Sequence, residues 1–341
     1  MTKTGANEDR KAALTAWLQE VLAPQTFELS IASADASFRR YFRVHTDNGS
    51  LIAMDAPPPQ EDCRPFVHVA GLMLDAGLNV PKVMAQDIER GFLLLSDLGD
   101  TTYLSELNQT TADALYRDAW SALVKLQLAS RAGVLPPYDE ALLTREMQLF
   151  PDWYVARHLG LTLDDKDSRL LQNTFAVLNR NLLAQPQVYV HRDYHSRNLM
   201  VCCDKPQQNP GVLDFQDAVY GPITYDLVSL LKDAYIAWEE ERVLDWTVRY
   251  WESARQAGLP VAEDFADFYR DFEWMGVQRH IKILGIFARL YHRDGKEGYL
   301  KDMPLVMDYL RRACVRYIEL RPFLRLLDKI EETRPQVGYT F

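Results

Sequence analysis

The segment from His191 to Asn198 contains the side chains and the spacing that phosphoryl transfer requires. Asp193 can accept the proton of an attacking hydroxyl, and Asn198, further along the same segment, can bind Mg²⁺ through its amide oxygen. Asp214, which is followed by Phe215, supplies a second and anionic metal ligand. The transition state of this reaction is stabilised by positioning and by metal charge rather than by covalent chemistry. The pattern therefore predicts a kinase-like phosphotransferase.

The residues around this pattern predict a β-hairpin that would bring the two metal ligands together. A turn-forming stretch at 204–210 separates two β-prone runs. Such a hairpin places Asn198 and Asp214 at the same edge. A chance match in an ordinary loop is the alternative, and it accounts for neither the hairpin nor the Asp-Phe pair. The β-prone runs are residues 188–190, 199–203 and 211–215.

The composition is typical of a globular protein that forms one large domain or two lobes. The 341 residues are 48% hydrophobic and 25% charged, and no apolar run approaches the roughly 20 residues of a membrane span. The start of the chain lacks the apolar core of a signal peptide, so we expect a cytoplasmic location and no membrane partner. The net charge of −10, without a basic run, argues against nucleic-acid binding. Four cysteines (Cys63, Cys202, Cys203 and Cys314) lack metal-binding spacing and predict reduced thiols.

Apolar periodicity predicts an α+β protein with two lobes of different composition. The first lobe, residues 1–98, is β-rich, and the second, residues 99–341, is helical apart from the catalytic hairpin. A crevice between such lobes is where a nucleotide would bind. The first lobe is expected to contain helices at 9–23 and 64–76 and strands at 38–44, 51–54, 83–87 and 92–95. The second is expected to contain helices at 110–131, 139–159, 166–184, 223–238, 241–257, 263–291 and 302–328.

Four further strings complete a resemblance that covers nearly the whole chain. With the kinase motif, the chain resembles the aminoglycoside phosphotransferase/choline kinase family, which has a bilobal protein-kinase-like fold. Within that family it is most similar to bacterial sugar kinases that phosphorylate the anomeric hydroxyl of N-acetylmuramate and N-acetylglucosamine in peptidoglycan recycling. The strings that carry this resemblance are residues 38–44, 53–58, 91–100 and 277–280.

The resemblance implies a role for each residue of the catalytic segment. Asp193 is expected to be the catalytic base, and Asn198 and Asp214 are expected to hold Mg²⁺ on the phosphates of ATP. His191 is expected to brace the loop rather than to react. Asp226 matches a buried aspartate that fastens the loop, and a helix N-cap is the alternative for this residue.

The resemblance also implies where the nucleotide binds. Adenine is expected to bond to the backbone at the junction of the lobes, formed here by Ser96, Asp97 and Leu98. The loop from Ser33 to Ser37 is expected to cover the phosphates, although it lacks the glycine pattern of a protein-kinase lid.

One departure from the family pattern concerns phosphate binding. Met54 stands where a strand lysine is usual, and His68 stands where a helix glutamate usually pairs with that lysine. Losing both is chemically coherent, because a buried glutamate without its lysine would be an uncompensated charge. Arg40 or Arg43 is expected to supply the missing positive charge, and an exposed strand residue is the alternative for each. The departure also leaves open a pseudokinase, which binds nucleotide without turnover.

The acceptor is expected to be a small molecule. Only residues 215–220 separate Asp214 from the next glycine, which leaves no room for the activation segment that docks peptides in protein kinases. Asp217 in this segment is expected to bond a sugar hydroxyl, or else to form a turn. Arg279 is expected to bind a lactyl carboxylate through its guanidinium, and a surface ion pair is the alternative for this residue. Trp274 is expected to be a stacking surface for the sugar ring, and a place in the core is its alternative.

Three functions are therefore open at the level of sequence. The first is an ATP- and Mg²⁺-dependent sugar 1-kinase acting on an amino sugar. The second is a kinase for a cationic acceptor such as choline or an aminoglycoside, with an aromatic or acidic cage at residues 152–154 or 238–241. The third is a nucleotide-binding regulator without activity. No obligate protein partner is evident.

Overall fold

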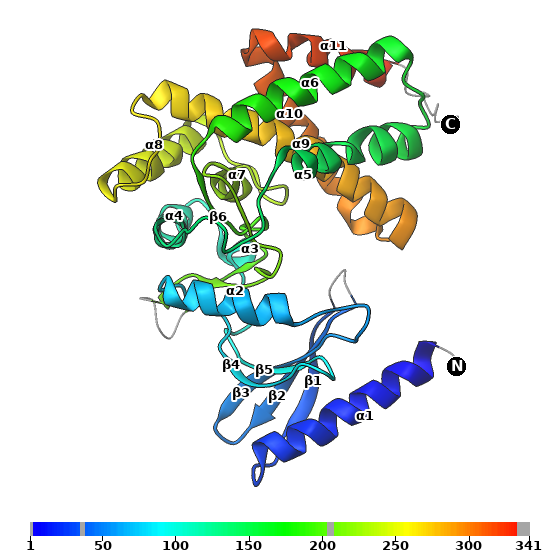
Figure 1. Ribbon diagram of the computed structural model, residues 1–341, viewed down its shortest axis with the longest axis vertical. Coiled ribbons are helices and arrows are strands. Elements are labelled where there is room, and N and C mark those ends of the chain that lie inside the picture. Colours follow the sequence, from blue (N-terminus) through cyan, green and yellow to red (C-terminus); the bar gives the residue numbers. More distant parts are fainter. Residues whose placement is uncertain (1–2, 35–37, 203–207, 333–341) are drawn as a thin grey trace. The chain divides into compact units, whose positions relative to one another are not determined.

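The computed structural model describes residues 3–34, 38–202 and 208–332 (Figure 1). Its contacts divide the chain into two compact units. The amino-terminal unit comprises residues 1–106 together with 198–217, and the carboxy-terminal unit comprises residues 107–197 together with 218–341. The hairpin thus belongs to the first unit, although the rest of that unit lies far away in the sequence. The lobe boundary expected at residue 98 stays a prediction.

The amino-terminal unit is built on a five-stranded antiparallel sheet with the order β1-β2-β3-β5-β4. Strand β1 was not expected from the sequence, although Leu29 and Ile31 alternate there with polar residues. The other strands match the predicted ones closely, and a tight turn at Asp47 and Asn48 joins β2 to β3. The strands are β1 (Glu28–Ala34), β2 (Arg40–Thr46), β3 (Gly49–Asp55), β4 (Val83–Asp87) and β5 (Phe92–Ser96).

The two faces of this sheet are distinguished by strand register. Phe42 lies opposite Ala53 and packs with Trp17 of helix α1 (Lys3–Leu22) in a buried cluster, so α1 covers this face. Tyr41 lies opposite Met54 and therefore points to the other face, because side chains alternate along a strand. Helix α2 (Arg64–Asp75) lies on that other side of the sheet (Figure 1).

The catalytic hairpin is attached to the amino-terminal unit by backbone bonds. It consists of β7 (Leu199–Met200) and β8 (Gly211–Val212), paired antiparallel. The Val212 amide donates to the Asn79 carbonyl at 2.8 Å, and the Val201 amide donates to the Thr101 carbonyl at 2.8 Å. Helix α3 (Tyr103–Glu106) begins two residues after Thr101.

The carboxy-terminal unit consists of helices around the long helix α9 (Phe265–Asp294), which is buried along most of its length. A two-stranded sheet consists of β6 (Gln187–Val190) and β9 (Val219–Pro222). Residues 191–198, which directly follow β6 and are expected to be catalytic, are called the catalytic loop below. The other helices of eight or more residues are α4 (Ala112–Leu128), α5 (Glu140–Met147), η1 (Phe150–His158), α6 (Asp165–Ala184), α8 (Glu240–Gln256), α10 (Met303–Arg316) and α11 (Arg321–Glu332). Shorter helices are α7 (Tyr225–Leu231), η3 (Glu297–Asp302) and η4 (Ile318–Leu320). The α+β fold class is confirmed.

Four predicted helices differ clearly from the observed ones. Helix α1 begins at Lys3 rather than at residue 9. The helix expected at 223–238 ends at Leu231, because the Asp233 carboxylate accepts the Tyr235 amide in a turn. The helix expected at 139–159 changes from α5 to the π-helix η1, which has a proline in its first turn. The helix expected at 302–328 is interrupted at Tyr317, which has an extended backbone.

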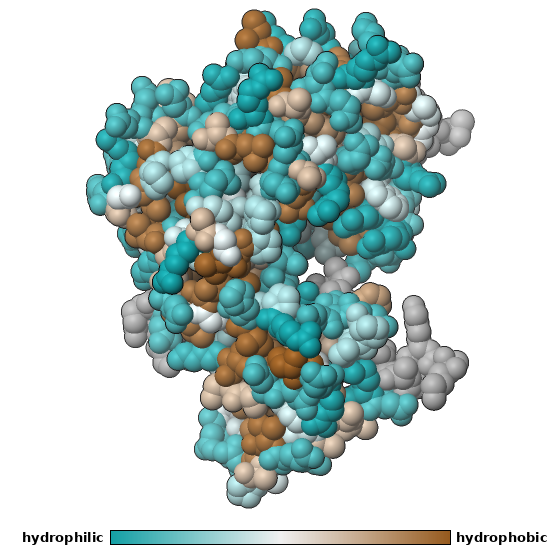
Figure 2. All heavy atoms as spheres, in the orientation of Figure 1, coloured by the Kyte–Doolittle hydropathy of each residue, from teal (hydrophilic) through white to brown (hydrophobic). Residues whose placement is uncertain are grey.

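The visible surface is mostly hydrophilic, with several groups of hydrophobic residues among the hydrophilic ones (Figure 2). Within the described ranges, every helix is too short or too polar to cross a bilayer.

Candidate active site

The catalytic loop follows strand β6 through a strained turn that one carboxylate holds in place. Arg192 has a φ of 78°, which is unfavourable for a residue other than glycine. The buried Asp226 accepts the His191 amide at 2.6 Å and the Arg192 amide at 3.0 Å. The N-cap of α7 is Thr224, so the N-cap alternative for Asp226 is wrong. Asp226 fastens the loop from the first turn of α7.

Burial controls the charge of this fastening carboxylate. Removal from water raises the pKa of Asp226 to about 7, although the bonds from the His191 and Arg192 amides oppose the rise. His191 is itself fully buried, and its Nδ1 accepts the Asp193 amide at 3.2 Å. This geometry suits the expected role of His191 as a brace.

A second buried carboxylate, Asp233, holds the far end of the loop. Its Oδ2 accepts the Ser196 amide at 3.0 Å and the Ser196 hydroxyl at 2.5 Å. Sequence reasoning missed Asp233. The available signal was an acidic residue directly after an apolar helix, which on sequence alone is indistinguishable from an ordinary exposed helix end. Asp226 and Asp233 together fix the backbone on both sides of Asp193.

The environment of Asp193 favours its ionised form. Burial favours the neutral acid, but the positive charges of Lys282, Arg279 and Arg192 help to outweigh it and hold the pKa of Asp193 below its ordinary value. Lys282 is itself charged, because Glu146 opposes the effect of burial and raises the lysine pKa. Asp193 is therefore an anion at neutral pH, which is the state that can accept a hydroxyl proton.

Glu146 of α5 is the centre of the network behind this loop. It is 5% exposed, and it accepts hydrogen bonds from Tyr138 and Arg192 and pairs with Lys282 at 3.1 Å. Burial by itself would raise the pKa of Glu146, but the charges of Lys282 and Arg192 outweigh burial, so this pKa lies below its ordinary value. The Lys282 ammonium also donates to the Tyr225 hydroxyl at 2.9 Å. The network ties α5, α9 and the catalytic loop together through ionised side chains.

The two expected metal ligands meet in the amino-terminal unit. The Asn198 amide nitrogen donates to Asp214 Oδ2 at 3.2 Å, so the hairpin brings these residues together as predicted. Asp214 Oδ1 accepts the Gln216 side-chain amide at 2.9 Å. The Oε1 atom of Gln216 is buried and has no hydrogen-bond partner. Asp214 has a φ of 64°, so the backbone is constrained at this expected metal ligand.

This donor set fits Mg²⁺. Amide and carboxylate oxygens are hard ligands, and Mg²⁺ is usually bound by one or two carboxylates with water and phosphate completing its shell. The unpartnered Gln216 oxygen adds a third oxygen donor beside Asp214. No group of three or more histidine, cysteine, aspartate or glutamate side chains suited to a metal occurs among the residues that the structure describes. A site of few protein ligands is consistent with an ion that is held mainly through nucleotide phosphates.

The residues expected at the adenine site form a fixed turn after β5. The Ser96 hydroxyl accepts the Lys82 amide at 2.9 Å, and Asp97 accepts the Arg43 Nε at 2.7 Å. Arg43 also donates to the Gly99 carbonyl at 3.0 Å. Leu98 lies in this turn, between Asp97 and Gly99. Binding of adenine by residues 96–98 stays a prediction, and Arg43 is engaged in holding their turn.

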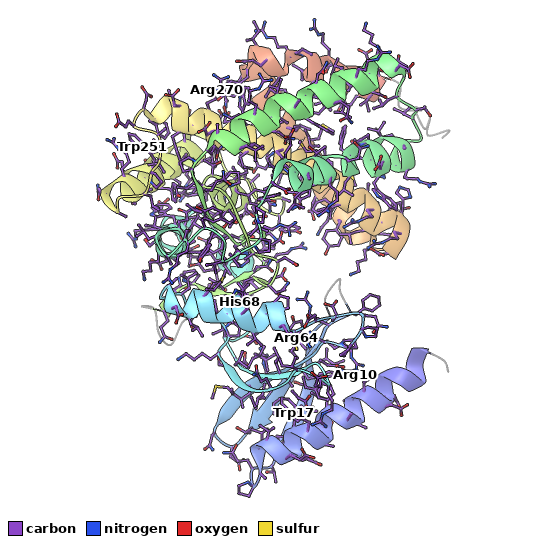
Figure 3. All side chains as sticks on the ribbon, viewed as in Figure 1. Arg10, Trp17, Arg64, His68, Trp251 and Arg270 are labelled. Atoms are coloured by element: carbon purple, nitrogen blue, oxygen red, sulfur yellow. The ribbon has the colours of Figure 1, made fainter. Side chains whose placement is uncertain are left out.

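The structure places the other residues that were expected to contact the nucleotide in different environments. Arg40 pairs with the fully buried Asp55, which also pairs with Arg10 of α1 (Figure 3 labels Arg10). Arg40 therefore lies on the face that α1 covers and not on the face of Met54. This position weighs against a phosphate contact for Arg40. Ser33 lies near the end of β1, in register with Tyr41. Ser37 lies outside the described residues. His68 is exposed on α2 (Figure 3) and Met54 is fully buried.

Arg279 is buried and lies close enough to Asp193 to affect its pKa. It is 4% exposed, its guanidinium lies 5.6 Å from the Tyr225 ring centre, and its Nε is buried without a hydrogen-bond partner. Burial lowers the pKa of Arg279, but Tyr225, Asp193 and Asp233 raise it above its ordinary value, so the guanidinium is charged. A buried donor without a partner is costly, which indicates a position that a ligand can satisfy.

The aromatic residues near the loop are not those expected. Trp274 is 3% exposed and packs against Tyr317 in the core, which favours the core interpretation over a stacking surface. Asp217 is exposed in the turn before β9. Tyr235 and Tyr299, which sequence reasoning missed, lie beside the loop instead, with the Arg197 guanidinium 3.5 Å from the Tyr235 ring centre and 5.9 Å from that of Tyr299.

Residues 28–270 match the phosphotransferase enzyme family. An N-acetylmuramate/N-acetylglucosamine kinase of Neisseria meningitidis is 52% identical over 338 residues, covering 97% of this chain and 99% of the relative. A protein of the same name from Pseudomonas aeruginosa is 51% identical over 342 residues, with 97% and 98% covered. The ADP-bound aminoglycoside phosphotransferase APH(2'')-Ib superposes with a TM-score of 0.55 at 15% identity, over 87% of this chain and 97% of that chain, which shows a common fold. The chain therefore belongs to the phosphotransferase enzyme family and is a kinase of the aminoglycoside phosphotransferase/choline kinase type.

Proposed function

We propose that this kinase transfers the γ-phosphate of ATP to the anomeric hydroxyl of N-acetylmuramate and N-acetylglucosamine, in the recycling of peptidoglycan sugars. The acceptor is supported by two relatives that bear this name and are 52% and 51% identical over nearly the whole chain. The use of nucleotide is supported by the shared fold and by the Asn198–Asp214 pair. The observation that carries the reaction is an anionic Asp193 in a loop that two buried carboxylates hold fixed.

In the proposed mechanism Asp193 orients the C1 hydroxyl and accepts its proton. As that proton moves, the hydroxyl oxygen bonds to the γ-phosphorus of ATP, and the bond from this phosphorus to the bridging oxygen breaks. The electron pair of the broken bond leaves with ADP, and the sugar 1-phosphate is formed. A positioned base contributes about 10²–10⁴ in rate. Lys282 and Arg192 assist indirectly, by keeping Asp193 ionised before the substrate binds.

Asn198 and Asp214 are proposed to hold Mg²⁺, with the Gln216 oxygen as a further donor beside them. When bound, the ion supplies positive charge that stabilises the phosphates in the transition state. Gln216 fixes the orientation of the Asp214 carboxylate through its 2.9 Å bond, so the protein contributes an ordered anion before the ion arrives.

Arg279 is proposed to recognise the lactyl carboxylate of N-acetylmuramate. Its planar guanidinium can donate two parallel hydrogen bonds to a carboxylate. Such a contact would also give the buried Nε, which has no partner in the structure, a hydrogen-bond acceptor. Tyr299 would provide an apolar surface for a sugar ring, whereas Arg197 already covers the Tyr235 ring at 3.5 Å. Asp217 remains a proposed hydroxyl contact, at its exposed position before β9.

One of the two predicted cages for a cationic acceptor, at residues 238–241, is already occupied. The Arg242 guanidinium lies 5.0 Å from the Trp238 ring centre, and the Trp238 nitrogen donates to the Tyr116 hydroxyl at 2.8 Å. A choline or aminoglycoside ammonium would have to displace an arginine that has the same charge. This contact favours the sugar over a cationic acceptor.

The test is ATP consumption with Mg²⁺ and each of N-acetylmuramate, N-acetylglucosamine, choline and an aminoglycoside, with products identified by phosphorus NMR. We expect an anomeric phosphate on the N-acetyl sugars. Turnover only with a cationic acceptor would overturn the proposed substrate. The D193N variant, which should bind nucleotide but lose turnover, separates catalysis by this site from a contaminating kinase, and a wild-type chain that binds nucleotide without turning over any acceptor would support the regulator instead.

A further inference from the structure

An ion pair joins the residue before β2 to the segment before α2. The Arg39 Nε donates to Glu61 Oε2 at 3.0 Å, and these side chains are 13% and 14% exposed. Glu61 Oε1 also accepts the Phe38 amide at 3.2 Å. One carboxylate therefore holds both the guanidinium and the backbone next to it. This is a built and largely buried pair, unlike the exposed pairs that contribute little to stability.

Arg39 lies on the same side of the sheet as Met54. Tyr41 is directly opposite Met54, and residues two apart in an extended chain share a face. The Arg39 guanidinium interacts with the Tyr41 side chain, which places both on this face. Arg40, by contrast, points to the α1 face with Asp55. Arg43 shares the face of Tyr41 by the same alternation, but it is paired with Asp97 in the turn after β5. Arg40 neutralises Asp55 on the other face.

The amino-terminal end of α2 lies near both the Arg39–Glu61 pair and the proposed metal ligand Asp214. Helix α2 begins at Arg64, shortly after Glu61. In its first turn, the Phe66 ring contacts the Phe215 ring at 4.7 Å between centres, and Phe215 directly follows Asp214. All these residues belong to the amino-terminal unit. The Arg39–Glu61 pair and the Asp214 carboxylate therefore lie at one end of one helix.

The chemistry of the pair suits a phosphate. Burial disfavours the charged guanidinium, but Tyr41 and Glu61 more than offset this and raise the pKa of Arg39 above its ordinary value. A guanidinium carries five N–H donors, so a bond from Nε to Glu61 is compatible with two-point contact between the terminal nitrogens and phosphate oxygens. Glu61 restricts the rotamers of the arginine and so reduces the ordering cost of binding.

We propose that Arg39, held in place by Glu61, binds the phosphates of the Mg²⁺-nucleotide and supplies the positive charge that Met54 does not. The inference rests on the proposed use of ATP, and it assigns the phosphate contact to a residue outside the strand positions where a lysine or arginine was expected.

The test is calorimetric titration of the full chain with Mg²⁺·ADP and, separately, with adenosine. In the R39A variant we expect the Kd for Mg²⁺·ADP to rise at least tenfold, and the Kd for adenosine to stay unchanged because adenosine has no phosphate. R64A is the matched control, since Arg64 is 66% exposed nearby on α2 and should leave both constants unchanged. Wild-type affinity of R39A for Mg²⁺·ADP, or an equal loss for adenosine, would overturn the inference.

A double variant guards against loss of folding. R39A leaves a partly buried Glu61 without its partner, whereas R39M/E61Q removes both charges and lets the glutamine oxygen still accept the Phe38 amide. We expect R39M/E61Q to retain the wild-type unfolding temperature and to show the same tenfold weaker binding of Mg²⁺·ADP. Wild-type affinity in the double variant contradicts the inference. If the wild-type chain binds no nucleotide, both this inference and the proposed function fail, whereas tight binding that is insensitive to Arg39 overturns the inference alone.

Discussion

Single charges decide whether the proposed base can work. Asp193 is close to the cationic side chains of Lys282, Arg279 and Arg192, and these charges help to outweigh the burial that would otherwise favour the neutral acid. Lys282 has the largest effect among them. The charge on Asp193 is therefore a property of its neighbours, and it can be changed without touching the base itself.

The K282M variant should move the acidic limb of the pH–rate profile. The depressed pKa of Asp193 keeps the base ionised until the pH falls through that pKa, so kcat/KM should decline only in acid. Removing Lys282 raises this pKa, and the decline should then begin at a higher pH. The measurement is kcat/KM between pH 4 and 9, with K166M as an exposed lysine control. An acidic limb at the same pH in K282M would contradict this account.

Arg279 provides a second prediction at this scale. R279M should raise KM for N-acetylmuramate about tenfold or more, because a hydrogen bond to a charged group contributes about 1.5–3 kcal/mol. KM for N-acetylglucosamine, which has no carboxylate, should change less. The two constants are measured at pH 8, where Asp193 is ionised with or without Arg279. R270M is the control, since Arg270 lies on the same helix in an exposed pair with Glu319. Equal changes for both sugars would exclude carboxylate recognition.

At the level of elements, the catalytic loop depends on helix α7 for its conformation. Asp226 in the first turn of α7 accepts the two amides of the strained turn at His191 and Arg192. Asp233, just after the same helix, accepts both donors of Ser196. A short, fully buried helix thus determines the path of a loop that precedes it in sequence.

Replacing Asp226 with asparagine should change both stability and its pH dependence. Because the pKa of Asp226 is raised from 3.8 to about 7, the folded protein retains a proton there that the unfolded chain releases. The contribution of this group to stability is therefore present below pH 4 and is lost as the pH rises through 7. D226N lacks this slope, and its NH₂ group faces a backbone donor, which lowers stability by about 1–3 kcal/mol. Urea unfolding at pH 5 and pH 8 measures both effects, with D245N as an exposed control, and an unchanged slope would refute the assignment.

The contact between α9 and the start of η1 requires a glycine. A Cβ built at Gly285 would lie 2.4 Å from the Leu149 carbonyl carbon, which is far closer than non-bonded atoms approach. G285A should therefore lower the free energy of unfolding by about 1–3 kcal/mol, measured by urea denaturation. G298A is a matched control, because nothing lies within 4 Å of the corresponding Cβ. Equal stability of the two variants would show that α9 and η1 can separate at little cost.

At the scale of the whole molecule, nucleotide binding should be visible as stabilisation. A ligand that binds only the folded state at 100 times its Kd stabilises it by about 2.7 kcal/mol. Mg²⁺·ADP should therefore raise the unfolding temperature, and removing Mg²⁺ with EDTA should abolish most of the increase. D214N should show the smaller increase even with Mg²⁺, since it removes the anionic member of the Asn198–Asp214 pair. An increase that is independent of Mg²⁺ in the wild type would contradict the proposed metal site.

Some elements of the fold could be predicted from the sequence, and others could not. Strands β2 to β5 and helix α9 were predicted because their apolar residues have a clear period. Strand β1 was missed because its short alternation leads into a polar stretch. The helix expected at 223–238 was too long because a side-chain bond from Asp233 competes with helical hydrogen bonds after Leu231.

The sequence by itself determined the reaction class, the α+β fold and the meeting of Asn198 with Asp214. These features depend on local spacing and on a hairpin, in which residues close in the chain are also close in space. Only the tertiary structure decided that Trp274 lies in the core, that Asp233 anchors the loop and that Arg39 rather than Arg40 shares the face of Met54. The reason is that burial and charge pairing depend on segments far apart in the chain, and periodicity along one segment carries no information about its partners.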